Sequence, residues 1–490
     1  MGTDESRRTF LKTAGAGLAL GACSSLRRDA GTATQRPNLL FVFPDEFRRQ
    51  AVGCMGEDPA LTPNLDRFAR DGVVFTSAVS NRPVCSPYRA SMLTGRYPFS
   101  TGVTTNCNTM TTQYDVFLKE SERCISDVLH DEGYSCGYIG KWHLETPRPP
   151  YLYARKSGEA WDEYTPPGPR RHGFEFWHSY GCHDNHMRPH YWTGDAPRDG
   201  YVEVDEWSPR HETGTAIEFI RNRDGKRRTA DKPFALFVSM NPPHMPFDLV
   251  PPEYVERYGR QSATDLLNRP NVDLATKEGQ EAKRWAKHYF AAVTGVDEQF
   301  GRMLACLKEE GLEDNTIVVF TSDHGEMMGS HGRMYKSVWY EESLGVPFLI
   351  RWPARLRPGR EEMILSTPDI MPTLLGLMDL ERRIPQQVEG GDYSRALLGK
   401  GGPYPTTALY LNHNPATPET GARGLRTPRY TYVIDRGPAG EERYLYDNER
   451  DPYQLRNVAG SNPALEKDLE RQLRMWLDHT RDPFVLGKSA

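Results

Sequence analysis

Four segments of the chain carry side chains that can bind a metal ion or transfer a proton, and each directly follows a run of apolar residues. The runs are continuous and rich in Val, Ile, Leu and Phe, which predicts strands buried on both faces of a parallel sheet. The polar groups lie at residues 45–46, 141–143, 241–244 and 323–326. The ligand of an open α/β sheet binds outside the carboxyl ends of its strands. We therefore expect the four groups to meet at one site.

The residue types suit the transfer of an anionic group with the help of a metal ion. Hard oxygen ligands, which Ca²⁺ and Mg²⁺ prefer, are offered by Asp45, Glu46 and Asp323. His324 is either a further ligand or a hydrogen-bond donor. Fixed positive charge for an anion is offered by Arg48, Arg89, Lys141 and Lys336. His143 and His244 can move protons near neutral pH, so the set favours transfer of a phosphoryl or sulfuryl group.

Each of these residues also has an ordinary structural explanation when it is taken singly. An aspartate at a strand end such as Asp45 often caps a helix, and a single histidine such as His244 usually packs or lies at the surface. Residues 323–325 are compatible with a turn. The same kinds of side chain after four separate strands would require four coincidences, so a common site is the favoured interpretation.

Residues 85–96 read Cys-Ser-Pro-Tyr-Arg-Ala-Ser-Met-Leu-Thr-Gly-Arg. The spacing predicts a helix over residues 86–93, with Pro87 and Arg89 in its first turn. The N–H groups and the dipole at that end of the helix then point toward whatever Cys85 binds, and they stabilise negative charge there. A buried structural cysteine is the ordinary alternative.

The remaining pattern predicts the elements that must position these residues. We expect strands at 38–43, 73–78, 134–139, 234–240, 316–321 and 346–351, and further helices at 62–72, 121–132, 281–310 and 368–377. This alternation predicts an α/β fold with a mostly parallel sheet. Residues 145–230 are rich in aromatic residues, Pro and Gly, which predicts long loops.

Beyond about residue 390 the pattern changes to short strands at 408–411, 430–434 and 443–446 and a final helix at 463–478. We therefore expect a catalytic domain over residues 37–390 and a smaller C-terminal α+β domain over 391–490, made of a short antiparallel sheet and a helix.

The first 36 residues read as an export signal and a tether. Residues 6–12, Ser-Arg-Arg-Thr-Phe-Leu-Lys, match a twin-arginine signal, whose partner is the Tat translocase. The apolar stretch at 14–22 is too short to span a membrane. Residues 20–23 resemble a lipoprotein cleavage box with Cys23 as the acylated residue. We expect an exported bacterial protein, periplasmic or lipid-anchored at the envelope, without a transmembrane span.

Composition excludes several classes of protein. The 490 residues contain 61 Lys and Arg against 66 Asp and Glu, a net charge of -5, which argues against a generally basic nucleic-acid-binding protein. The 38% hydrophobic and 26% charged residues exclude wholesale disorder and a multispan membrane protein. Seven of the eight cysteines follow Cys23, and an odd number indicates at least one thiol with its own role. None forms a Cys-x-x-Cys pair, which argues against a structural zinc site.

The segment 85–96 resembles the signature of the formylglycine-dependent (type I) sulfatases of the alkaline-phosphatase superfamily, Cys-x-Pro-x-Arg followed by Leu-Thr-Gly-Arg. A second signature of that family resembles residues 133–143. Further resemblances lie at 37–45, 62–66, 241–247, 321–326 and 445–452. They extend over nearly all of residues 37–480 and imply an alkaline-phosphatase-like fold and a sulfatase activity.

The resemblance also implies a nucleophile and its helpers. A formylglycine-generating maturation enzyme would oxidise Cys85 to formylglycine, whose hydrated aldehyde attacks sulfur in line. His244, with Lys336 nearby, would protonate the leaving alcohol, and His143 would deprotonate the second hydroxyl to expel sulfate. Arg89 would hold the hydrated aldehyde.

Lys141 would bridge the aldehyde and the sulfate group in this scheme. The metal ion would be held by Asp45, Asp323, His324 and residue 85, with Glu46 as a further candidate ligand. Ca²⁺ is the expected ion, with Mg²⁺ or Mn²⁺ as alternatives.

Two positions depart from the common family pattern. Glu46 stands where a second aspartate is frequent, and His324 stands where many members have asparagine. The Asp-His variant also occurs in the related phosphonate monoester hydrolases, but those relatives typically lack the lysine that this chain keeps as Lys141. A sulfatase is therefore the prediction. The alternatives are a phosphonate monoester or phosphodiester hydrolase on the same scaffold and an exported glycan-binding protein without catalysis.

The segment 172–192 combines aromatic and polar residues in a predicted loop, where specificity determinants are common. Aromatic faces beside hydrogen-bonding groups suit a sugar, and simple packing of the loop on the sheet is the alternative. We expect a sulfated carbohydrate, or another sulfated small molecule, as the substrate. Arg48, His183 and Asp184 are candidate substrate-binding residues.

Overall fold

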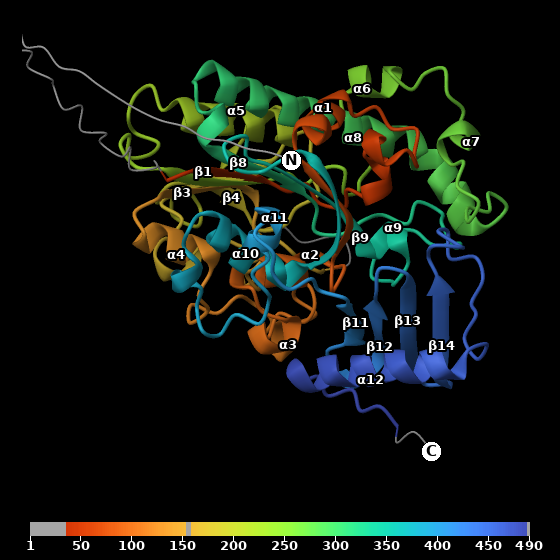
Figure 1. Cartoon of the computed structure of the whole chain (residues 1–490). Helices are drawn as coiled ribbons and strands as arrows, with labels where there is room; N and C mark the ends of the chain where they lie inside the picture. Colours follow the sequence, from red (N-terminus) through yellow and green to blue (C-terminus); the bar gives the residue numbers. More distant parts are fainter. Residues whose placement is uncertain (1–35, 153–157, 488–490) are drawn as a thin grey trace, which may run out of the picture. The chain divides into compact units, whose positions relative to one another are not determined.

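This computed structural model describes residues 36–152 and 158–487 (Figure 1). Its core is a ten-stranded sheet. The strand order in this sheet is β10-β2-β9-β8-β1-β7-β3-β4-β5-β6. The strands are β1 Asn38–Val42, β2 Val73–Val79, β3 Ser135–Lys141, β4 Phe176–Tyr180, β5 His190–Thr193, β6 Val202–Glu203, β7 Phe234–Ser239, β8 Thr316–Thr321, β9 Gly345–Arg351 and β10 Gly359–Ser366. Strands β8, β1, β7, β3 and β4 run parallel, so their carboxyl ends share one edge. The predicted mostly parallel sheet is confirmed.

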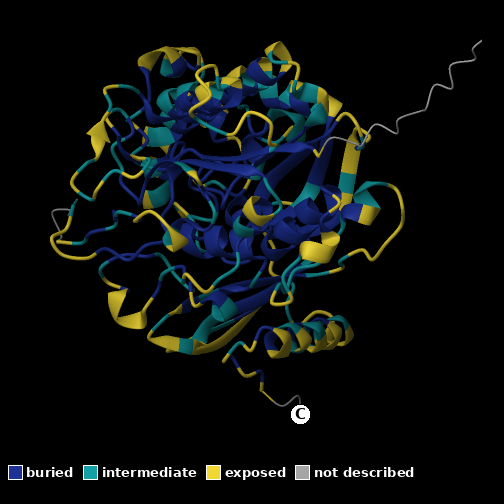
Figure 2. Ribbon diagram, turned by 90° about the vertical axis from the view of Figure 1, so that its left-hand side faces the viewer, coloured by how far each residue is buried: buried dark blue, intermediate teal, exposed yellow. Residues whose placement is uncertain are grey.

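Strand β1 shows why the sheet is covered on both faces. Leu39 and Phe41 belong to one hydrophobic core, and Leu40 and Val42 belong to another, because successive side chains of a strand point to opposite faces. Figure 2 shows the buried sheet between the two layers. The α-helices are α1 Pro63–Asp71, α2 Cys85–Thr94, α3 Pro98–Thr101, α4 Ile125–Asp131, α5 Ser208–Arg221, α6 Pro252–Glu256, α7 Ala263–Leu266, α8 Lys277–Glu309, α9 Glu341–Leu344, α10 Ile370–Leu377, α11 Ser394–Leu397 and α12 Pro463–His479.

The two layers are built from different helices. Helices α1, α5 and α8 cover one face of the sheet, and α2, α4 and α10 cover the other. Helix α2 begins with Cys85 at the carboxyl edge of the parallel strands, where the polar groups were expected to meet.

The C-terminal part is a four-stranded antiparallel sheet, β11 Ala408–Asn414, β12 Thr417–Arg426, β13 Tyr430–Gly437 and β14 Gly440–Asp447. Helix α12 packs on it through Leu469, Leu473 and Leu477, which recur along one face of the helix. The predicted α+β character is confirmed. The domain boundary between residues 390 and 391 stays a prediction, and the described residues from Arg36 onward form one compact unit.

Three expectations were wrong in detail. Residues 145–230 are not only loops, since they contain β4, β5, β6 and α5. Strands β5 and β6 are too short to show a clear alternation. Strands β10 and β12 were not anticipated, because charged residues and glycines interrupt their apolar pattern. With β12, the C-terminal sheet has four strands, whereas the sequence predicted three.

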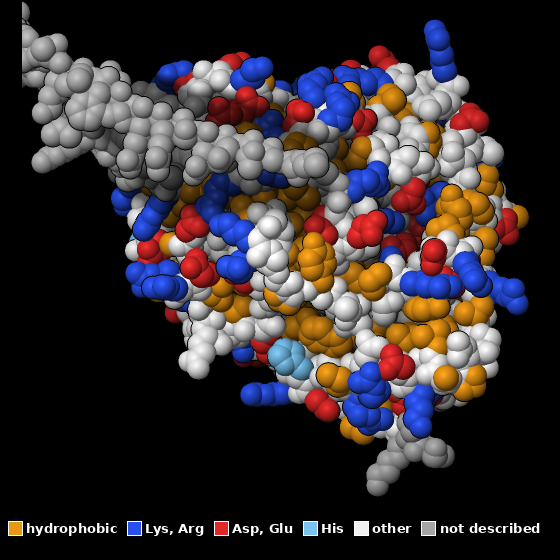
Figure 3. All heavy atoms as spheres, viewed as in Figure 1, with side chains coloured by type: hydrophobic (Ala, Val, Ile, Leu, Met, Phe, Trp, Pro, Cys, Tyr) orange, Lys and Arg blue, Asp and Glu red, His pale blue; other side chains and the backbone are white. Residues whose placement is uncertain are grey.

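The export motif and Cys23 lie outside the described residues. Within the described residues, no helix combines the length and the apolar character that a membrane span requires. On the face drawn in Figure 3, acidic and basic side chains are interspersed, as the nearly balanced composition leads one to expect.

Gly140 is the second-last residue of β3 and directly precedes Lys141. Its φ is 93°, and a Cβ at this position would lie 2.1 Å from the Ser239 carbonyl oxygen of the neighbouring β7. Both the backbone conformation and the close approach therefore require glycine.

We predict that Gly140→Ala lowers the free energy of unfolding by about 2 kcal/mol or more, because the strand pair must separate or strain. Urea denaturation measures the change. Gly214→Ala in α5 is the control, since a Cβ there meets no atom within 4 Å, and it should stabilise the protein by about 1 kcal/mol or less. An unchanged denaturation midpoint for Gly140→Ala would contradict this assignment.

Candidate active site

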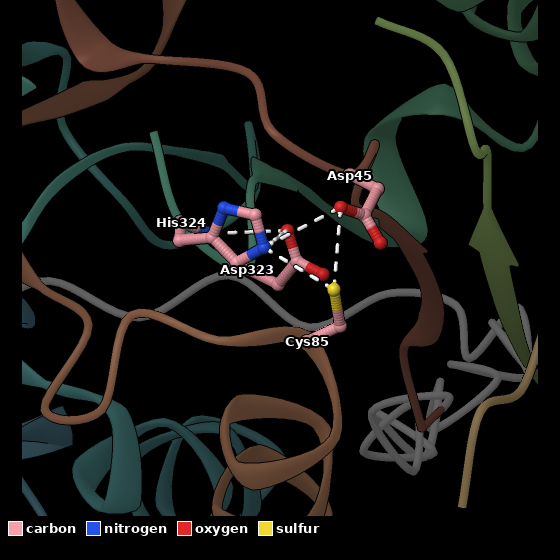
Figure 4. A group of neighbouring side chains, drawn as sticks. All are labelled: Asp45, Cys85, Asp323 and His324. Carbon is pink, nitrogen blue, oxygen red and sulfur yellow. Dashed lines mark hydrogen bonds and ion pairs between the residues drawn. The ribbon is translucent and has the colours of Figure 1, made fainter. Parts of the chain in front are cut away.

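The polar groups that follow β1 and β8 meet the first residue of α2 at the carboxyl edge of the sheet (Figure 4). The Sγ of Cys85 lies 3.4 Å from His324 Nε2 and 3.7 Å from Asp45 Oδ1. His324 Nε2 is also 3.4 Å from Asp45 Oδ1 and 3.6 Å from Asp323 Oδ1. All four residues are buried. Two carboxylates, a thiol and an imidazole thus face one another away from bulk water.

Three cations surround this cluster. Arg89, one turn along α2 from Cys85, places Nη2 3.1 Å from both Asp45 Oδ2 and Asp323 Oδ2. Lys141 at the end of β3 places Nζ 2.7 Å from Asp45 Oδ2. Lys336 places its Nζ 3.6 Å from Cys85 Sγ. The ends of β1, β3 and β8 thus bring Asp45, Lys141 and Asp323 into one buried network, and Arg89 and Lys336 add further positive charge.

The network lowers the pKa of the Cys85 thiol. Burial and Asp45 raise this pKa, but Lys141, Lys336 and His324 together outweigh them and bring it to about 6. The environment of residue 85 therefore stabilises an anion, as a nucleophile or a bound oxyanion requires.

Two histidines lie beside the cluster, and both are held neutral. Burial, Lys141 and Arg89 lower the pKa of His143, and burial, Lys336 and Lys141 lower that of His244. His143 Nε2 lies 3.1 Å from the Cys107 carbonyl oxygen, and His244 Nδ1 lies 2.6 Å from the Met245 carbonyl oxygen. A carbonyl only accepts, so these nitrogens donate and the opposite ring nitrogens can accept a proton.

A pocket of about 340 Å³ opens over the cluster. Its lining includes six predicted residues besides Glu46, namely Cys85, Lys141, His143, Asp184, His244 and Lys336. It also includes residues that the sequence did not single out: Asn106, Trp161, Cys182, Met245 and Tyr335. Cys182, Met245 and Tyr335 each adjoin a predicted site residue, and this adjacency was the signal available for them, whereas Asn106 and Trp161 had no such neighbour.

Two predicted substrate-binding residues do not line the pocket. The Nε of Arg48 lies 2.6 Å from Asp58 Oδ2, and its guanidinium stacks over the Phe290 ring. The His183 ring packs between Tyr180 and another histidine, and burial lowers its pKa to about 3. Both side chains are committed to buried contacts, which the sequence pattern alone could not reveal.

The donor atoms fit a divalent cation, and the two carboxylates among them suit a hard one. Ligand atoms of Asp45, Cys85, Asp323 and His324 lie within 4.8 Å of one another. His324 Nδ1 donates to the Gly325 carbonyl oxygen at 3.0 Å, which directs Nε2 toward the carboxylates in the orientation of a metal ligand. Burial lowers the pKa of His324, but Asp323 and Cys85 raise it to about 9. The cluster therefore favours added positive charge.

Glu46 adds a second set of donors. Its two buried carboxylate oxygens have no hydrogen-bond partner among the described residues, and they lie 3.5 Å from Lys336 Nζ and His244 Nε2. Burial raises the pKa of Glu46 above its ordinary value, against the effect of Lys336. A ligand atom of Glu46 also groups with Asp45 and His244. Glu46 is thus an under-satisfied acceptor at the edge of the cluster.

Comparisons with known proteins point to one family. The family model described as Sulfatase matches residues 37–380, and the model described as N-sulphoglucosamine sulphohydrolase, C-terminal, matches residues 329–482. An endo-4-O-sulfatase of Bacteroides thetaiotaomicron is 38% identical, with 96% of this chain and 98% of the relative covered. An ulvan-active sulfatase of Formosa agariphila is 34% identical, with 92% and 82% covered.

Solved structures give the same result for the fold. A Bacteroides fragilis structure that is named as a sulfatase superposes with a TM-score of 0.87 at 41% identity, covering 92% of this chain and 97% of the other. A structure from work on the metabolism of multiple glycosaminoglycans by Bacteroides thetaiotaomicron superposes with a TM-score of 0.84 at 38% identity, with the same coverage.

Proposed function

The chain belongs to the sulfatase family and is a sulfuric ester hydrolase, and on this premise we propose that it removes sulfate from a sulfated carbohydrate with residue 85 as the nucleophile. The observation that carries the proposal is the placement of Cys85 between Lys141 and Lys336 at the base of the pocket. A sulfate group brought there meets two fixed cations, which favours an anionic substrate.

Two kinds of observation support a carbohydrate substrate. Relatives that match nearly the whole chain are named an endo-4-O-sulfatase and an ulvan-active sulfatase. The pocket lining combines an aromatic residue, Trp161, with polar groups such as Asn106 and Asp184. Aromatic surfaces beside hydrogen-bonding groups are typical of sites that bind sugars.

We propose that Cys85 is converted to formylglycine by a maturation enzyme, which supplies a hydrated aldehyde as a covalent nucleophile. The residues around it then divide the work. Lys141, whose Nζ lies 4.0 Å from Cys85 Sγ, and Arg89, one turn along the same helix, hold negative charge at residue 85 and on the sulfate. His244, beside Lys336, donates a proton to the departing alcohol.

His143 also lines the pocket with residue 85. Its Nδ1 has no hydrogen-bond partner among the described residues, so it is available to accept the proton of the second hydroxyl when sulfate is expelled. Because the pKa values of His143 and His244 are both lowered, each ring is neutral before the reaction. His244 therefore must take up a proton before it can donate one. Burial lowers the pKa of Lys336, but Cys85 and Glu46 raise it well above its ordinary value, so Lys336 keeps its proton and acts as a fixed cation beside the departing oxygen.

We propose that the divalent cation of the site is Ca²⁺, held by Asp45, Asp323, His324 and residue 85, with Glu46 as an additional ligand. When bound, it would neutralise sulfate charge. Two buried carboxylates and the Glu46 oxygens, which accept no hydrogen bond among the described residues, support an oxygen-binding divalent cation. The choice of Ca²⁺ over Mg²⁺ or Mn²⁺ follows the resemblance to the sulfatases. We further propose export through the Tat translocase and acylation at Cys23, on the sequence pattern alone.

We predict that the matured protein cleaves sulfated oligosaccharides with higher kcat/KM than aryl phosphodiesters or phosphonate monoesters. Cys85→Ala should lower kcat/KM by about 10³-fold or more, because the covalent nucleophile is lost. Cys54→Ala is the control, since Cys54 lies outside the pocket. Steady-state kinetics on the three ester classes measures this.

Several outcomes would contradict this proposal. Preference for the phosphorus esters would instead assign a phosphonate monoester or phosphodiester hydrolase. Turnover of small aryl sulfates without any sulfated saccharide would remove the carbohydrate. Binding of a saccharide without turnover by matured protein would leave a glycan-binding protein.

We predict that chelation of divalent cations lowers both activity and melting temperature, and that Ca²⁺ restores them. A cation at 100 times its dissociation constant stabilises a protein by about 2.7 kcal/mol. Asp323→Asn should abolish this Ca²⁺-dependent shift, whereas Asp115→Asn in an exposed ion pair with Lys119 should preserve it. Calorimetric melting with and without Ca²⁺ tests this, and a Ca²⁺ response that survives in Asp323→Asn would disprove the assigned ligands.

A further inference from the structure

Lys336 reaches the pocket from a backbone segment that is held in a rare conformation. Its two neighbours, Tyr335 and Ser337, have φ values of 69° and 75°. Residues with a side chain adopt this left-handed region only at a cost, and they remain there where surrounding contacts enforce it. The position of the Lys336 ammonium, 3.6 Å from Cys85 Sγ, therefore depends on what holds the two neighbours.

The catalytic part of the chain holds the segment on the Tyr335 side. The Tyr335 backbone N–H donates to Glu326 Oε1 at 2.8 Å, and the Tyr335 hydroxyl donates to Glu281 Oε1 at 2.9 Å. Glu326 Oε1 also accepts the Met328 backbone N–H at 2.8 Å, so one buried carboxylate closes this end of the loop.

The C-terminal sheet holds the segment on the Ser337 side. The Ser337 carbonyl oxygen accepts two hydrogen bonds from β11, one from Asn412 Nδ2 at 2.8 Å and one from the Tyr410 hydroxyl at 3.1 Å. The Ser337 backbone N–H donates to the Pro83 carbonyl oxygen at 3.2 Å. The bond to Pro83 thus fixes the peptide unit that directly follows Lys336, and two side chains of the small sheet fix the next one, between Ser337 and Val338.

The other end of the Asn412 amide contacts the segment before residue 85. Asn412 Oδ1 accepts a hydrogen bond from Arg82 Nη1. Arg82 is buried, and its remaining contacts are with the carbonyl oxygens of Thr104 and His413, at 3.3 and 3.4 Å. Next to it, the Leu411 backbone N–H donates to the Asn81 carbonyl oxygen at 2.9 Å. One amide therefore joins the chain that leads into Cys85 to the chain that leaves Lys336.

We propose that Asn412 is a positioning residue that holds Lys336 beside residue 85, so that the C-terminal sheet forms part of the catalytic machinery. The proposal rests on the function proposed above, in which Lys336 assists departure of the alcohol. If the Asn412 hydrogen bond were purely structural, its loss would lower the rate equally for every leaving group. A positioning bond matters most when the leaving alcohol needs a proton.

The substitution Asn412→Asp isolates this role. An aspartate keeps an oxygen that accepts from Arg82, but it replaces the Nδ2 donor with an oxygen that cannot donate to Ser337. Tyr410→Phe removes the second donor to the same carbonyl without a change of charge. Asn414→Asp, an exposed position two residues along β11, is the matched control.

On a sulfated sugar, whose alcohol is a poor leaving group, we expect Asn412→Asp to lower kcat by about 10-fold. On 4-nitrophenyl sulfate, whose leaving group needs no proton, we expect a loss of about 2-fold or less. In a Lys336→Ala background the further loss from Asn412→Asp should vanish, because both changes remove the same contribution. Tyr410→Phe should show the same leaving-group dependence with a smaller loss.

Hydrogen exchange gives a readout that does not require the matured enzyme. In the unmodified Cys85 protein, backbone amides of residues 327–338 should exchange faster in Asn412→Asp than in wild type and unchanged in Asn414→Asp. Equal losses on both substrates, additive losses with Lys336→Ala, or unchanged exchange would overturn the proposal. If wild type shows no sulfate-ester turnover, or Lys336→Ala has no effect, the proposed function itself fails, which is a distinguishable result.

Discussion

The burial of several charges of both signs at one sheet edge is the constraint on which the rest of the structure depends. Asp45 and Asp323 lie out of contact with bulk water, and a buried charge is tolerated only when it is paired and hydrogen-bonded. Arg89 meets that need for both carboxylates at 3.1 Å, and Lys141 adds a third contact. The first turn of α2 and the end of β3 must therefore lie where they do, because Arg89 in that turn and Lys141 at that end carry the countercharges.

The same constraint explains why the site can handle sulfate. Lys141, which pairs with Asp45, also lowers the pKa of Cys85 together with Lys336 and His324, so the position is prepared for negative charge before any substrate arrives. Such prearranged charges avoid a reorganisation during the reaction and are an efficient form of catalysis. The match to the sulfatase family and the electrostatic arrangement of the site independently indicate hydrolysis of a sulfate ester.

The sequence predicted the central strands well because their apolar runs are long and unbroken. Strand β8 was predicted with its observed bounds, and β1 differs by a single residue. The convergence of residues 45, 141, 244 and 323 followed from the rule that parallel strands end at a common edge. Arg48 and His183 could not be placed from sequence, since their side chains are buried by tertiary contacts, such as that of Arg48 with the Phe290 ring far away in the chain. The hydrogen bond from Asn412 of β11 to Ser337 is likewise a tertiary contact that no local sequence pattern predicts.

The central claim is that residue 85 is converted to an aldehyde nucleophile within this cationic pocket. The most direct test is the mass of the peptide spanning residue 85, in protein isolated from its native host, after any aldehyde has been trapped with a hydrazide. The account predicts the mass of a trapped formylglycine. An unmodified thiol in folded, exported protein would contradict the account, because Cys85 would then be a structural residue or a different kind of nucleophile.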